Sequence, residues 1–101
     1  MNFKEKYVAL MAQVQLNNIN TPHNIDLNEI IRRINIDAVR LKGIHLYHIK
    51  FGDEAHRVGE KDTKLIKYAS GRTYGQADYS TKERYNLLAE RIRGLLEERR
   101  I

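Results

Sequence analysis

The uneven distribution of glycine constrains the fold of this 101-residue chain more than any other feature of its sequence. Five of the six glycines lie between positions 43 and 75, at Gly43, Gly52, Gly59, Gly71 and Gly75. Glycine suits turns and is unfavourable inside a helix. We therefore expect strands and turns in the centre of the chain and helices at its two ends.

Two helices are expected before residue 36, because apolar residues recur there at helical spacing. Asn2 and Glu5 form a capping-box-like pair at the start of the first helix, and the second helix begins near Asp26. Residues 17–24 are expected to form a loop. The first buried face would be Tyr7, Leu10, Met11 and Val14, and the second Leu27, Ile30, Ile31 and Ile34.

Residues 36–43 fit two structures. Asp37 can cap a short third helix that Gly43 closes, or the segment is extended. A helix here would create a helix-turn-helix in which Arg40 and Lys42 lie on the recognition helix.

The centre of the chain is expected to form two or three antiparallel strands, at residues 44–51, 55–58 and 63–69. Turns are expected at residues 52–54, 59–62 and 70–72. The C-terminal segment is expected to be a long helix, capped by Ser80 with Glu83, whose apolar stripe is Tyr85, Leu88, Ile92, Leu95 and Leu96. The sequence therefore predicts a single α+β domain over residues 1–101. Two or three N-terminal helices would precede a small antiparallel sheet, and the C-terminal helix would pack on that sheet.

The composition narrows the possible sites. The absence of cysteine excludes a disulfide scaffold and a Cys-ligated metal, and fits a cytoplasmic protein. No apolar run approaches the length of about 20 residues that spans a bilayer. His45 and His48 would point to opposite faces of a strand. We therefore expect no metal, cofactor or membrane partner.

Two stretches without acids carry the main functional signal. The net charge is +5 with a pI of about 9.6, and residues 38–52 and 63–77 contain no Asp or Glu. Cations neutralise phosphates, and an aromatic ring gives an unpaired base a surface to stack on. The sequence thus predicts a non-enzymatic domain that binds DNA or RNA, or that acts as a regulator, through Arg40, Lys42, Lys50, Lys64, Lys67 and Arg72, with Tyr74 as the stacking residue.

Two alternatives remain open. The first is a protein-binding inhibitor or adaptor, with the C-terminal helix as the seam of a homodimer. The second is a small metal-independent ribonuclease, which needs a base, an acid and a cation near the phosphate. Residues 46–52 with 56–58 resemble the central hairpin of small toxin ribonucleases, although the N-terminal strand of that family is absent. The residues of the required types are His45, His48, His56, Arg57, Lys67, Arg72 and Tyr74.

Overall fold

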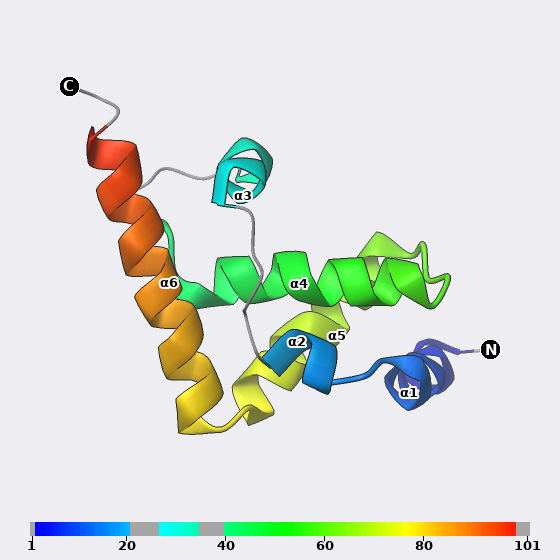
Figure 1. Cartoon of the computed structure of the whole chain (residues 1–101). Coiled ribbons are helices and arrows are strands. Elements are labelled where there is room, and N and C mark those ends of the chain that lie inside the picture. Colours follow the sequence, from blue (N-terminus) through cyan, green and yellow to red (C-terminus); the bar gives the residue numbers. More distant parts are fainter. Residues whose placement is uncertain (1, 21–26, 35–39, 99–101) are drawn as a thin grey trace.

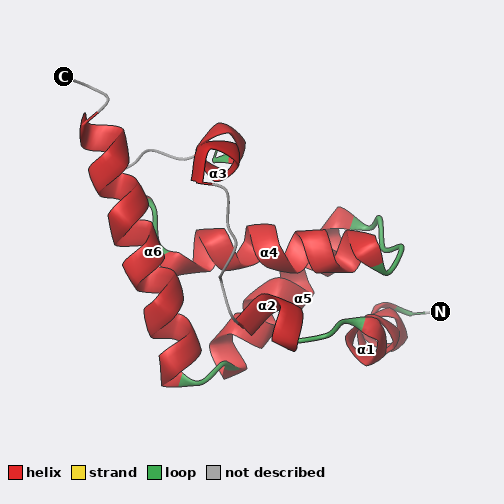
Figure 2. Cartoon of the chain, viewed as in Figure 1, coloured by secondary structure: helices red, strands yellow, loops and turns green. Residues whose placement is uncertain are grey.

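Every regular element in the described part of the chain is a helix. The computed structural model describes residues 2–20, 27–34 and 40–98 (Figures 1 and 2). The helices are α1 (Phe3–Gln13), α2 (Asn17–Asn20), α3 (Leu27–Arg33), α4 (Gly43–Arg57), α5 (Thr63–Gln76) and α6 (Tyr79–Glu98). The prediction of an α+β fold with an antiparallel sheet is therefore wrong for these residues.

Helix α4 replaces the first two predicted strands and the turn between them. Its buried side chains recur at a helical spacing, as in Leu46, Tyr47, Phe51, Glu54 and Ala55. Residues 44–51 suggested a strand because residue types common in strands dominate them. The helix, however, continues past the glycine at position 52. That glycine lies inside the helix and is tolerated at a cost of about 1 kcal/mol relative to alanine.

Helix α5 replaces the third predicted strand and the turn after it. Asp62 caps it by accepting hydrogen bonds from the backbone N–H groups of Lys64 and Leu65, at 3.1 and 3.2 Å. Gly71 and Gly75 lie within the helix rather than in turns. Of the central glycines, Gly59 is the one with a positive φ, at 92°, and it lies in the connection between α4 and α5. The predicted turn at residues 59–62 is the central turn that the structure retains.

The N-terminal predictions hold in part. The side chain of Asn2 accepts a hydrogen bond from the backbone N–H of Glu5, as expected for the cap of α1. Leu10 and Val14 are buried, and so is Ile30 on α3. Part of the loop expected at residues 17–24 is the short helix α2, and residues 21–24 lie outside the described part.

Two helix starts differ from the predictions. Asp78 rather than Ser80 caps α6, because its carboxylate accepts a hydrogen bond of 2.8 Å from the backbone N–H of Thr81. Gly43 begins α4 instead of closing a preceding helix. Residues 41–42 are not helical, and Arg40 has a 3₁₀ conformation. Residues 35–39, on which the short helix depends, lie outside the described part.

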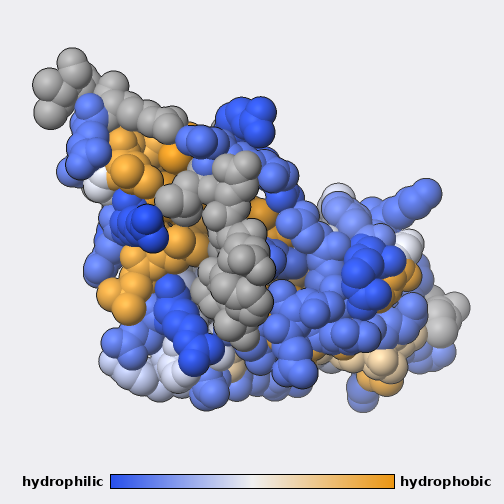
Figure 3. All heavy atoms as spheres, viewed as in Figure 1, coloured by the Kyte–Doolittle hydropathy of each residue, from blue (hydrophilic) through white to orange (hydrophobic). Residues whose placement is uncertain are grey.

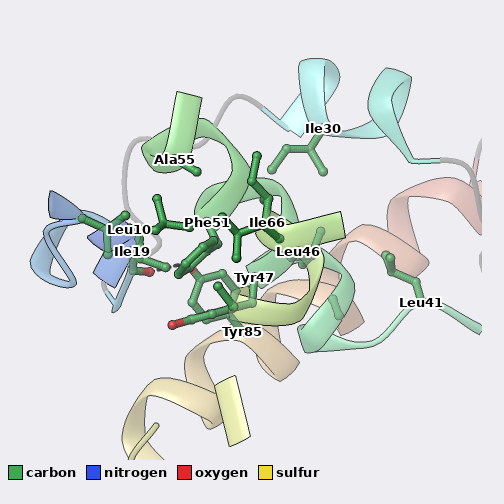
Figure 4. Packing of buried hydrophobic residues seen from close by; sticks show 14 of the residues in the cluster. Leu10, Ile19, Ile30, Leu41, Leu46, Tyr47, Phe51, Ala55, Ile66 and Tyr85 are labelled. Atoms are coloured by element: carbon green, nitrogen blue, oxygen red, sulfur yellow. Dashed lines mark hydrogen bonds between the residues drawn. The ribbon is translucent and has the colours of Figure 1, made fainter. Parts of the chain in front are cut away.

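The central unit is an antiparallel pair of helices, α4 and α5, joined by a short connection (Figure 1). Helix α6 crosses α4 near one end of this pair, while α1 packs on α5 at the other end. Figure 4 shows the hydrophobic core, in which aromatic rings from α4 and α6 contact apolar side chains of α1 and α2. The centroids of the Tyr47 and Tyr85 rings lie 5.2 Å apart. None of the described helices has both the length and the hydropathy that a membrane-spanning segment requires.

Candidate nucleic-acid interface

One face of α5 is exposed and free of acidic residues. Lys64, Tyr68 and Arg72 are four residues apart, so they lie in one row along the helix. Lys67 flanks this row, and Gly75 extends it; all five residues are exposed. We call these five residues, Lys64, Lys67, Tyr68, Arg72 and Gly75, the α5 surface. Thr63 and Gln76, at the two ends of the helix, are exposed as well, and neither is charged.

Aromatic rings of α1 adjoin the α5 surface. The ring of Tyr68 makes edge contacts with the rings of Phe3, at 5.1 Å between centroids, and Tyr7, at 5.5 Å. The guanidinium of Arg72 lies 5.7 Å from the centroid of the Tyr7 ring. Phe3 and Tyr68 are 46% and 45% exposed, so both retain ring surface for a ligand.

These rings line a pocket of about 300 Å³, which we call the aromatic pocket. Its lining is Phe3, Lys4, Tyr7, Val8, Tyr68 and Arg72. Three rings, two cations and no carboxylate are the groups that suit an unpaired base with its phosphate. The arrangement depends on packing between α1 and α5, which are separated by about fifty residues in the sequence.

A second pocket lies between α4 and α5, on the other flank of the α5 surface. It has a volume of about 270 Å³ and is lined by His48, His56, Thr63, Ile66, Lys67 and Ser70. We call it the histidine pocket. A hydrogen bond joins Nδ1 of His48 to the buried hydroxyl of Ser70. Burial, together with the positive charges of His45 and Lys67, lowers the pKa of His48 below its ordinary value.

The structure does not bring the remaining predicted cations to this surface. Lys42 precedes the first residue of α4, whereas Lys64 lies near the first residue of α5, so the two are at opposite ends of the antiparallel pair. Lys50 is two residues from His48, which places it about 200° away around α4. Arg40 is exposed ahead of α4. The stretch 38–52 therefore contributes His48, but not its lysines, to the flank of α5.

Tyr74 does not present a free ring. Its side chain is half-buried, and the centroid of its ring lies 5.0 Å from that of the Tyr47 ring. The ammonium of Lys82 lies 5.9 Å from the centroid of the Tyr74 ring. Burial raises the pKa of its hydroxyl. The exposed tyrosine of this helix is Tyr68, which takes the position expected of a stacking residue.

The residues proposed for a ribonuclease are divided between several environments. His48, His56 and Lys67 line the histidine pocket. Arg57 instead donates two hydrogen bonds of 2.7 Å to the buried carboxylate of Glu54. Nδ1 of His45 accepts a hydrogen bond from the backbone N–H of Lys42 at the start of α4. In residues 2–20, 27–34 and 40–98, no three His, Asp or Glu side chains are grouped to hold a metal ion.

Sequence reasoning missed the contribution of α1 and the pocket role of Ser70. A helical interpretation of residues 63–76 would have placed Lys64, Tyr68 and Arg72 on one face, because they recur every four residues. No sequence signal links Phe3 to Tyr68, since their contact depends on how α1 packs.

Comparisons with protein-family models, with curated proteins and with solved structures found no match for this chain.

Proposed function

We propose that this protein binds single-stranded nucleic acid across the α5 surface and the aromatic pocket. The observation that carries the proposal is the junction of three exposed cations with an exposed aromatic pocket that contains no acid. Backbone phosphates would lie along Lys64, Lys67 and Arg72, and release of their counterions would supply most of the affinity. This keeps three of the predicted cations and replaces Tyr74 with Tyr68.

The aromatic pocket supports a single strand rather than a duplex. A base can stack on an aromatic ring only when it is not already stacked within a duplex, and such contacts tolerate any base. Tyr68 and Phe3 offer exposed ring surface beside the cations. The proposal therefore specifies a single strand and no base sequence. RNA in the cytoplasm, the location expected from the sequence, is the ligand class we favour.

Gly75 supports close approach of the ligand backbone. A Cβ atom added there would meet no atom within 4 Å, so the helix backbone is open to the outside. A strand can approach such a helix more closely than one covered by side chains.

The test compares two triple variants with the same net charge. In the first, Lys64, Lys67 and Arg72 become alanine; in the control, the exposed arginines Arg32, Arg84 and Arg91 become alanine. Both change the net charge from +5 to +2. We expect the first to lower the affinity for a fluorescent oligonucleotide on the order of 100-fold in 0.1 M salt. The control should lose only a few-fold, because these arginines lie on α3 and α6 rather than on the α5 surface, and salt screens exposed charges beyond about 10 Å.

Equal losses in the two triple variants would contradict the assignment of the α5 surface. Absence of binding by the wild-type protein would contradict the function itself and favour the protein-binding alternative. Cleavage of the oligonucleotide during the assay would favour the ribonuclease alternative.

The protein-binding alternative has weaker support from the geometry of α6. Tyr85 and Ile92 from the apolar stripe of α6 are fully buried in the core of the same chain. Leu88, Leu95 and Leu96 are partly buried. On the face drawn in Figure 3, apolar side chains gather along α6, and Leu87 is 56% exposed. Because the stripe is largely used within the domain, we favour nucleic acid over a homodimer at α6.

A further inference from the structure

Polar and cationic side chains that suit an anion line the histidine pocket, together with the apolar side chain of Ile66. Lys67 supplies an ammonium, His48 and His56 supply imidazoles, and Thr63 supplies a hydroxyl. No Asp or Glu lines it. Three acids close in sequence accept hydrogen bonds from other groups. Glu54 accepts from Arg57, Asp62 accepts from the backbone of α5, and Glu60 accepts from the backbone N–H groups of residues 61 and 62.

The hydrogen bond to Ser70 engages Nδ1 of His48, and its direction sets which ring nitrogen carries the proton. When the buried hydroxyl of Ser70 donates to Nδ1, a neutral imidazole must carry its proton on Nε2. His48 can then donate a hydrogen bond from Nε2 without becoming charged. Burial lowers its pKa and so favours this neutral form. The charge of Lys67, rather than that of His48, would supply most of the attraction at pH 7.

We infer that the histidine pocket binds the terminal phosphate monoester of a nucleic-acid strand whose backbone lies on the α5 surface. The inference rests on the proposed function, and Lys67 connects the two, because it belongs to the α5 surface and also lines the pocket. The pocket is a recess of about 270 Å³ between two helices, which suits the end of a chain better than its middle. A monoester carries a charge of about −1.5 to −2 at pH 7, more than an internal diester.

The experiment compares oligonucleotides of one sequence that carry a 5′-phosphate, a 3′-phosphate or only hydroxyl ends. We expect the wild-type protein to bind one of the phosphorylated forms at least about fivefold more tightly than the hydroxyl form. This end preference should disappear in Lys67→Ala and His56→Ala. Both side chains are exposed, so both variants should remain folded, as circular dichroism can verify.

Lys64→Ala is the matched control. Lys64 lies on the α5 surface but does not line the histidine pocket. Its loss should weaken binding of all three oligonucleotides equally and leave the end preference intact. An end preference that survives in Lys67→Ala and His56→Ala would overturn the inference, as would equal binding of all three forms by the wild type. In the latter case the proposed function would stand, because the hydroxyl form would still bind. Absence of binding by all three forms would overturn both.

Discussion

The carboxylate of Glu54 is a buried charge that ties three segments of the chain together. It accepts hydrogen bonds from the guanidinium of Arg57, from the backbone N–H of Gln15 at 2.7 Å and from the amide of Asn18 at 3.1 Å. The guanidinium lies on the outer side, half exposed, while the carboxylate is enclosed. Hydrogen bonding from Arg57, assisted by that from Gln15, lowers the pKa of Glu54 to about 2 against the opposing effect of burial.

Glu54 should make the fold sensitive to acid. Because its pKa is depressed in the folded state, its stabilising effect is complete above its ordinary pKa of 4.5 and is lost as the pH falls towards 2. We expect Glu54→Gln to lower the free energy of unfolding at pH 7 on the order of 2 kcal/mol. The deficit should shrink between pH 5 and pH 2, which urea unfolding across that range would reveal. A deficit that is the same at all pH values would show that the charge is not responsible. Glu90→Gln, at an exposed position of α6, is the control.

Tyr68 is the residue on which stacking depends most. We expect Tyr68→Ala to weaken binding of a single-stranded oligonucleotide by about 1–3 kcal/mol, and Tyr68→Phe to retain most of the affinity. Fluorescence anisotropy at one salt concentration measures both. Tyr79 on α6 is 78% exposed and lies outside the aromatic pocket, so Tyr79→Ala should bind as the wild type does. A Tyr68→Ala variant that binds normally would remove the stacking role.

The crossing of α4 and α6 depends on a close approach at Gly43. A Cβ atom there would lie 2.8 Å from the backbone nitrogen of Asn86 and 2.9 Å from the carbonyl carbon of Tyr85. The N–H of Gly43 also donates a hydrogen bond of 3.1 Å to the side chain of Asn86. The first turn of α4 therefore packs directly on the backbone of α6.

Alanine at two glycines should have opposite effects on stability. Gly43→Ala forces α4 and α6 apart, and we expect it to cost about 1–3 kcal/mol. Gly94→Ala places a methyl group where no atom lies within 4 Å, and it should stabilise α6 by up to about 1 kcal/mol. Thermal unfolding of the two variants tests this. Equal changes in Tm would show that the crossing is looser than the structure indicates.

Local signals predicted the helices at the ends of the chain, and failed in the centre. Asn2 and the spacing of Leu10 and Val14 predicted α1, because its cap and buried face lie within fourteen residues. In α4 and α5, Gly52, Gly71 and Gly75 suggested turns, but packing against neighbouring helices outweighs their propensity. The site was likewise predictable only where local sequence determines it. Lys64, Lys67 and Arg72 share a face that follows from the sequence once α5 is known to be a helix, whereas the contacts of Phe3 and Ser70 depend on tertiary structure.

At the scale of the whole molecule, the location of charge matters more than its total. The net charge of +5 is shared by cations on every helix from α1 to α6 except α2. The α5 surface differs because it has three exposed cations and no acid. It lies between the aromatic pocket and the histidine pocket, and neither pocket is lined by an acid. Binding should therefore depend on where a cation lies and not on the net charge alone.

The salt dependence of oligonucleotide binding tests this account most directly. The logarithm of the association constant falls linearly with the logarithm of salt concentration, with a slope of about −0.7 for each phosphate neutralised on a single strand. Replacing Lys64, Lys67 and Arg72 together should therefore reduce the magnitude of the slope by about 2. Replacing Arg32, Arg84 and Arg91 should leave the slope near the wild-type value. The same slope in the wild type and in the Lys64, Lys67 and Arg72 variant would show that the α5 surface does not contact the phosphates.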